Sequence, residues 1–231
     1  MTWFKKLGLK KNPFVLDPSK FKDRFMFNKN HLDNLIYWVK ASSIVVVRGP
    51  KYSGKTKIVL ELRKSFSGKI IYIDLNKYNK QIDIGSLLIK SQPLHRRLLN
   101  LYPKNMILIL DNTSNFAPDF YKRLQYFFDE GYIKSLIFVY KSNKIVNMPL
   151  SLVSRIGNKY IDLNSFNKQE AIQIIDSRLK GKVFSNEHLE FIYDKSEDFE
   201  SFVVNCEKIA QHLAYKDNKD IDFNFIRKVL N

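Results

Sequence analysis

The sequence predicts an α/β fold in which helices cover a parallel five-stranded sheet, followed by a small all-helical domain. Three observations support this prediction. Short apolar runs without polar alternation recur through the first two thirds of the chain, which is typical of strands buried on both faces. Segments with helical periodicity separate these runs, as in parallel sheets built from strand–helix–strand units. Beyond residue 165 the pattern is purely helical.

Each element is predicted from its local pattern of apolar residues and turn signals. A helix over 29–40 leads into the first strand. The expected strands are 43–47, 69–75, 106–110, 135–140 and 159–163. The expected helices between them are 55–66, 84–101 and 118–129, and those of the tail are 168–179, 185–195, 199–214 and 222–230. We therefore expect an N-terminal arm (1–28), a sheet domain (29–164) and a helical domain (165–231).

Composition limits the class of protein. A chain of 231 residues can bury a substantial core, and its single cysteine, Cys206, allows no intramolecular disulfide. The longest apolar runs, such as 106–110, are too short to span a bilayer, and the basic N-terminus lacks an apolar signal-peptide stretch. We therefore expect a soluble, cytoplasmic protein without a membrane span.

The positive charge is concentrated in the first part of the chain. The net charge is +16; the region from Ser165 onward carries ten basic and twelve acidic residues, which leaves 29 basic and 11 acidic residues, a net +18, for residues 1–164. This excess suggests a polyanionic partner such as nucleic acid, bound without sequence specificity. A solvated lysine-rich surface is the open alternative. In the arm, aromatic residues between the lysines suit either single-stranded nucleic acid or packing of the arm onto the protein.

The strongest motif follows the first strand. It matches the phosphate-binding pattern G-x-x-x-x-G-K-[ST] in full, with a strand before it and a helix after it. Glycines turn backbone N–H groups toward phosphate oxygens, Lys55 reaches the terminal phosphates and Thr56 binds magnesium. The expected binding residues are Gly49, Pro50, Lys51, Tyr52, Ser53, Gly54, Lys55, Thr56 and Lys57. We expect ATP or ADP as the ligand, together with Mg²⁺.

An aspartate ends the third apolar run. Asp111 follows 106–110 directly, so its carboxylate is expected at a strand tip, where it can hold Mg²⁺ beside Thr56. An aspartate that ends a strand is often only a turn residue, but the upstream phosphate-binding loop favours the magnesium role. We therefore expect Thr56 and Asp111 to form the metal site.

With these motifs the chain resembles the AAA+ P-loop ATPases, particularly the archaeal-type, ExeA-like and origin-recognition-like branch. Asn12-Pro13-Phe14 is similar to the opening of ExeA-like members, and the strand 70–75 resembles the second strand of archaeal-type members. The segment from Phe184 to Asp222 looks like the family's helical lid. The resemblance implies a nucleotide between sheet domain and lid, often at an interface with another copy or a related subunit.

The resemblance also implies roles for single residues. The polar residue that positions the attacking water falls on Ser142 or Asn143, of which we favour Asn143, and Arg155 falls where many members place an arginine that reaches a neighbouring subunit's γ-phosphate. Ordinary loop or solvated residues are the alternative at both positions. Two departures bear on hydrolysis: Asn112 replaces the usual glutamate after the strand-tip Asp111, and Glu200 stands where the lid usually has an arginine.

Together these observations predict an AAA+-like ATPase or ATP-dependent switch that works in an oligomeric assembly on or near DNA, with weak hydrolysis. Lys55, Asp111, Asn112, Asn143 and Arg155 are the candidate catalytic residues. One alternative is a non-catalytic nucleotide-binding scaffold subunit, which Asn112 supports, because an amide cannot accept a proton from water. A small-molecule P-loop kinase is a weaker alternative, since the acidic tail has few arginines.

Overall fold

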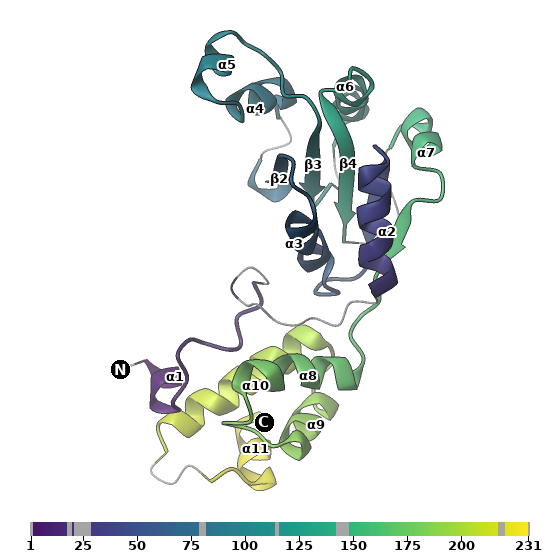
Figure 1. The fold of residues 1–231 in the computed structure, drawn as a ribbon. Helices are drawn as coiled ribbons and strands as arrows, with labels where there is room; N and C mark the ends of the chain where they lie inside the picture. The colour runs from purple at the N-terminus through teal and green to yellow at the C-terminus, as the bar shows by residue number, and fades with distance from the viewer. Residues whose placement is uncertain are drawn as a thin grey trace. The chain divides into compact units, whose positions relative to one another are not determined.

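The computed structural model describes residues 2–17, 20, 29–78, 82–113, 116–141, 148–216 and 220–230. The chain divides into two compact units: residues 27–164, which we call the sheet unit, and residues 1–26 with 165–231, which we call the helical unit. Figure 1 shows the helices and strands of each unit. Each unit has its own apolar core.

The sheet unit contains a five-stranded sheet with the strand order β2-β3-β4-β1-β5. All neighbouring strands that pair are parallel. The strands are β1 (Ile44–Arg48), β2 (Ile70–Asp74), β3 (Met106–Asp111), β4 (Ile133–Tyr140) and β5 (Tyr160–Asp162). The predicted α/β fold with a parallel five-stranded sheet is therefore confirmed.

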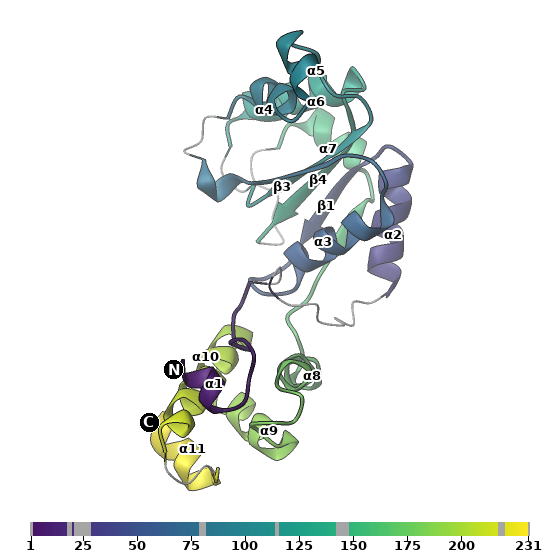
Figure 2. The ribbon, with the colours of Figure 1, turned by 60° about the vertical axis from the view of Figure 1, so that its left-hand side comes forward.

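Helices cover both faces of this sheet. On one face, α2 and α3 pack against alternate strand residues such as Val45 and Ile109. On the other face, α4, α6 and α7 pack against the residues in between, such as Val46 and Leu108. Figure 2 shows the two helical layers on either side of the strands. The helices are α2 (Lys29–Lys40), α3 (Lys55–Ser65), α4 (Ile84–Lys90), α5 (Leu94–Leu98), α6 (Pro118–Asp129) and α7 (Leu150–Ile156), with a short 3-10 helix, η2 (Leu75–Lys77).

Because the strands are parallel, their carboxyl ends all lie at the same edge of the sheet. The loop that starts at Gly49 follows β1, and Asp74 and Asp111 are the last residues of β2 and β3. These two strands pair in register, with Asp74 opposite Asp111. The carboxyl edge of a parallel sheet is where ligands bind in open α/β folds, and this edge therefore carries the candidate site.

The helical unit combines the C-terminal helices with the N-terminal segment. Its helices are α1 (Trp3–Lys6), α8 (Lys168–Leu179), α9 (Asn186–Asp194), α10 (Phe199–Ala214) and α11 (Phe223–Leu230). Helices α8, α9 and α10 each start with a capping box, at Asn167, Ser185 and Asp198. The capping side chain accepts a hydrogen bond from a backbone N–H of the first turn, which has no partner within the helix. These local signals explain why the helix starts follow the sequence pattern.

The N-terminal segment packs into the helical core. Leu9 and Phe14 are buried there, and Trp3 stacks on Phe14 with ring centroids 6.0 Å apart. Asn12 Nδ2 donates to Glu207 Oε1 at 2.7 Å. The arm expected as a separate part over 1–28 therefore clusters, over residues 1–26, with the helical unit. The described aromatic residues of the arm serve packing, the second of the two roles left open for them.

Three segments differ from the predicted elements. The helix expected over 84–101 is two helices, α4 and α5, because Pro93 lacks an N–H group and takes an extended ψ of 154° between them. Helices α1 and α7 were not predicted, and both are short. Among the described residues, every helix is too short or too polar to cross a bilayer.

Candidate nucleotide-binding site

The loop leaves β1 at Gly49, where the backbone passes close to the end of β5. Gly49 has a φ of +154°, and a Cβ there would lie 2.1 Å from the Leu163 carbonyl oxygen. It would also lie 2.9 Å from Ser53 Oγ. Backbone cannot move aside as a flexible side chain can, so only glycine fits. The first glycine of the motif is thus required by the contact with the chain after β5.

The second half of the loop turns into α3 through left-handed residues. Tyr52 has a φ of +61°, and Gly54, the N-cap of α3, has φ and ψ of 86° and 8°. No side chain caps the first turn of α3. The N–H groups at the start of α3 and the positive end of the helix dipole therefore favour an anion at the loop.

The side chain of Lys55, the first residue of α3, turns back toward the preceding loop. Its ammonium group donates to the Pro50 carbonyl oxygen and, at 3.3 Å, to Ser53 Oγ. Burial lowers the pKa of Lys55 to about 8; Asp111 opposes this shift, and Lys141 adds to it. A phosphate oxygen in the loop would compete with the Pro50 carbonyl for this ammonium, and its negative charge would favour the protonated lysine.

Asp111 lies next to the start of α3. Its side chain is almost fully buried, and its Oδ2 accepts a hydrogen bond from Thr56 Oγ1 at 3.1 Å. Tyr72 from β2 donates its hydroxyl to the same oxygen. Burial, and next the hydrogen bond to Asp111, raise the pKa of Tyr72 far above its usual value. Tyr72 therefore remains a neutral donor that holds the Asp111 carboxylate.

The pair of Thr56 and Asp111 fits a magnesium site. A hydroxyl and a carboxylate are hard oxygen donors, and Mg²⁺ is commonly held by one or two carboxylates together with phosphate oxygens and water. Among the described residues no group of three or more His, Cys, Asp or Glu side chains could hold a metal on its own. The donor set thus suits a cation that enters with a nucleotide, whose phosphates complete its coordination.

Asn112 lies one residue beyond the strand tip, in a left-handed conformation with a φ of +64°. Its backbone N–H donates to the Val139 carbonyl oxygen at 3.1 Å. Its side-chain amide donates to Asp74 Oδ1 at 2.7 Å. The sequence argument did not select Tyr72 or Asp74 as site residues. The available signal was that β2, like β3, ends in an aspartate.

Some expected binding residues point elsewhere. Lys57 is buried on α3, and its Nζ lies 3.3 Å from Glu61 Oε1, one helical turn on. Lys51 lies over the ring of Tyr52 at 4.6 Å. In this structure the side chain of Lys57 therefore pairs within α3 rather than with the loop.

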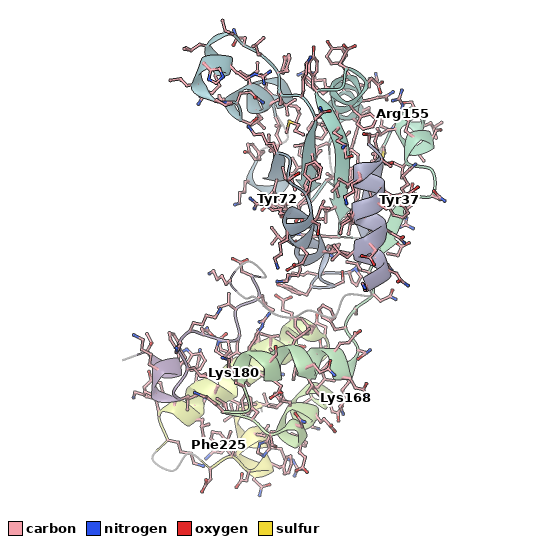
Figure 3. All side chains as sticks on the ribbon, in the orientation of Figure 1. Tyr37, Tyr72, Arg155, Lys168, Lys180 and Phe225 are labelled. Carbon is pink, nitrogen blue, oxygen red and sulfur yellow. The ribbon has the colours of Figure 1, made fainter. Side chains whose placement is uncertain are left out.

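Arg155 lies at the opposite edge of the sheet from the loop. It is in the last turn of α7, before the start of β5, and pairs with Asp129 at the end of α6, before the start of β4. Figure 3 labels Arg155 beside α7 and Tyr72 near the loop helix α3. Arg155 precedes a strand, as expected. Since it lies at the edge opposite the loop, Arg155 is not part of the phosphate-binding site of its own chain.

Two further expected residues lie outside the described part of the sheet unit. Asn143, with Ser142, lies outside the described residues. Glu200 lies in the first turn of α10 in the helical unit. There its negative charge interacts favourably with the positive end of the helix dipole. The sheet unit thus brings together Lys55, Thr56 and Asp111. Asn112 is next to this group because it directly follows Asp111, the last residue of β3.

Comparison with protein families decides the class of this site. A family model described as "AAA domain" matches residues 41–172. This range is more than half of the chain and contains the loop, Asp111 and Arg155. The chain belongs to the AAA domain family. The resemblance to AAA+ P-loop ATPases is confirmed, and nucleotide binding is the property that this AAA protein shares with its family.

Known proteins extend the comparison. Curated tRNA dimethylallyltransferases of several Staphylococcus aureus strains are 24% identical over 217 residues, which cover 78% of this chain and 68% of the relative. Three solved structures are similar to it across nearly the whole chain. At the identities reported below, this similarity shows a shared fold.

The solved structures come from three organisms. Cdc6p from Pyrobaculum aerophilum has a TM-score of 0.71 at 18% identity, covering 95% of this chain and 70% of that one. The ORC1 protein of Aeropyrum pernix in complex with DNA has a TM-score of 0.72 at 14% identity, covering 95% and 68%. The RuvB Holliday junction branch migration motor of Thermotoga maritima has a TM-score of 0.69 at 16% identity, covering 94% and 72%.

Proposed function

We propose that this AAA protein binds ATP with Mg²⁺ and acts as an ATP-dependent switch with slow intrinsic hydrolysis. The observation that carries the proposal is the 3.1 Å hydrogen bond between Thr56 and Asp111 beside the start of α3. It supports a cation site directly next to backbone N–H groups that suit an anion. Lys55, buried in the same loop, is the positive charge for the terminal phosphates.

Slow hydrolysis is proposed from two residue types. Asn112, bound to Asp74, stands where hydrolysing members have glutamate, and an amide can orient water without accepting its proton. Glu200 stands where the lid usually carries an arginine, and a carboxylate there would repel the γ-phosphate. Both features leave binding intact and weaken turnover.

The assembly is the next part of the proposal. We expect residues 165–231 of the helical unit to act as a lid whose closure depends on the nucleotide. Since Arg155 lies far from the loop of its own chain, it can reach a γ-phosphate only in a neighbouring subunit, after leaving Asp129. An arginine supplied in this way stabilises charge in the transition state. Asn143 is proposed to position the attacking water.

Nucleic acid is the proposed partner of the assembly. Residues 1–164 carry a net charge of +18, and two of the similar structures are named for DNA, one as a DNA complex and one as a Holliday junction motor. The curated relatives are named for tRNA. Binding is expected to be non-specific and to weaken steeply with salt. Weak binding to duplex and single strands at low salt, with no salt dependence, would remove this part of the proposal.

The binding proposal is tested by isothermal titration of ATP with and without Mg²⁺. Replacing Thr56 by valine removes the hydroxyl and keeps the shape, so the affinity gained from Mg²⁺ should fall by about tenfold or more, the scale of one lost charge-assisted bond. Ser151→Ala, on α7 at the other sheet edge, is the control and should bind as the wild type does. If the wild type shows no ATP binding at millimolar concentration, the proposal is wrong.

A non-catalytic scaffold is the second candidate, and Asn112 is the observation that favours it. Tight ATP binding without turnover above background would support the scaffold. Turnover on the order of 1 s⁻¹ or faster would contradict slow hydrolysis. Asn112→Glu alone is a poor test of restored catalysis, because the new carboxylate would occupy a left-handed position next to Asp74.

A small-molecule kinase remains the weaker alternative, and transfer of phosphate to a small acceptor would reveal it.

A further inference from the structure

A second carboxylate stands beside Asp111 at the carboxyl edge of the sheet. Asp74 ends β2 and pairs in register with Asp111 at the end of β3. Tyr72, two residues before Asp74, belongs to the face that α2 and α3 cover, and its hydroxyl reaches Asp111. Since side chains two apart on a strand share a face, Asp74 lies on the same side as the phosphate-binding loop helix.

Asn112 ties this carboxylate to the strand tip of β3. The left-handed backbone of Asn112 turns its amide toward β2, where it donates to Asp74 Oδ1 at 2.7 Å. The backbone N–H of Asn76 donates to the same oxygen at 3.1 Å. Within the part of the chain that the structure describes, no hydrogen bond reaches Oδ2 of Asp74. This oxygen therefore keeps its capacity to accept a proton, while the other one holds the group in place.

We infer that Asp74 is the general base for ATP hydrolysis in this protein, positioned by Asn112. The inference rests on the proposed function and names the residue behind its slow turnover. Asn112 is an amide at the tip of β3, and the Asp74 carboxylate lies one strand away at the tip of β2. The pair therefore keeps one acid and one amide at neighbouring strand ends.

The step balances without a further reactant. The water oxygen forms a bond to the γ-phosphorus, and the bond from that phosphorus to the β–γ bridging oxygen breaks, with its electron pair leaving on ADP. The proton released by the water passes to Asp74 Oδ2 and then to solvent. The products are ADP, inorganic phosphate and a proton. A positioned carboxylate base contributes about 10²-fold or more to such a step.

A purely structural role for Asp74 makes a different prediction. Asp74 also caps η2 by accepting the N–H of Asn76, and asparagine caps such turns about as well as aspartate. Asp74→Asn therefore keeps the shape and the cap and removes only the charge. If capping were its whole role, this variant would hydrolyse ATP as the wild type does.

The experiment measures single-turnover ATP hydrolysis, ATP affinity and melting temperature for the purified full chain. Asp74→Asn is expected to lower the hydrolysis rate about 10²-fold, with the dissociation constant for ATP changed less than about threefold and an unchanged melting temperature. Asp83→Asn is the matched control, because Asp83 caps α4 in the same way. It lines a pocket with Tyr102 and Phe127 to which no residue of the phosphate-binding loop contributes. This control should leave all three quantities unchanged.

Two further experiments test the pairing itself. Asp74→Asn combined with Asn112→Asp exchanges the two side chains and moves the carboxylate to the tip of β3. Aspartate tolerates the left-handed backbone of position 112, so this variant should restore the wild-type rate. Without nucleotide, the melting-temperature shifts of Asp74→Ala and Asn112→Ala should not add in the double variant, as expected for residues in contact. Additive shifts would contradict the pairing.

The outcomes separate the inference from the proposed function. An unchanged rate in Asp74→Asn, or a wild type that binds ATP and never hydrolyses it, overturns the role of Asp74 and leaves ATP binding intact. A wild type that does not bind ATP overturns both. Loss of rate in Asp74→Asn with intact affinity, and its recovery in the swapped pair, supports Asp74 as the base.

Discussion

At the scale of single residues, the charge of Lys55 depends on its burial. Its pKa is lowered to about 8, so the folded protein without nucleotide loses this positive charge as the pH rises through that value. ATP favours the charged form, and linkage then makes ATP affinity fall above pH 8. We expect the dissociation constant for ATP to rise by about tenfold between pH 7 and pH 9, measured by titration calorimetry in non-coordinating buffers.

The control for this prediction is Lys55→Met, which should bind ATP more weakly at every pH and show little change over the same range. The proton uptake that accompanies binding near pH 8 gives a second measurement, through buffers of different ionisation enthalpy. An affinity of the wild type that stays constant from pH 7 to pH 9 would show that Lys55 does not carry the expected pKa.

At the scale of elements, the N-terminal segment is part of the helical unit's core. Phe14 is 2% exposed and contacts the cluster around Phe184 and Phe202. Phe14→Ala should therefore lower the free energy of unfolding by about 3–5 kcal/mol, measured by urea denaturation. Val204→Ala, on the exposed side of α10, should change it by no more than about 0.5 kcal/mol. A small effect of Phe14→Ala would instead favour an exposed binding role for the arm.

Helices and strands lie where the sequence predicted them wherever apolar periodicity and turn signals point to the same boundaries. Helices α2, α6, α8 and α10 begin and end where their apolar periodicity predicted. The break at Pro93 and the short helix α7 were missed. Periodicity over a long window hides a single proline, and a seven-residue helix offers too few turns to show a period. Its existence depends on the packing of Leu152 and Ile156 against the sheet.

At the scale of the whole molecule, the position of Arg155 bears on assembly. Arg155 lies in the last turn of α7, before β5, so under the proposed function it acts on the nucleotide of a second chain. Arg155→Ala and Lys55→Ala should each lower the ATPase rate at least about tenfold. A one-to-one mixture should recover roughly a quarter of the wild-type rate, because random neighbours join an intact loop with an intact arginine in that fraction of heterologous interfaces.

The mixing experiment has a clear contrary result. If the mixture is no faster than the average of the two variants, Arg155 does not act across an interface. Sedimentation of the wild type with and without ATP is the accompanying measurement, since the same interface should raise the particle mass when nucleotide is bound. Asp129→Asn, which frees Arg155 from its partner, should leave the recovery intact.

The sequence alone determined the parallel sheet, the phosphate-binding loop and the Asp111 strand tip. These are local: a strand, a turn that needs glycine and a helix are written in consecutive residues. Only the tertiary structure decided which side chains meet across strands. Tyr72 on Asp111 and Asn112 on Asp74 join residues 39 and 38 positions apart, and strand order and register, which no local pattern contains, place them together. The same packing paired Arg155 with Asp129 and buried Phe14 among helices that follow it by more than 150 residues.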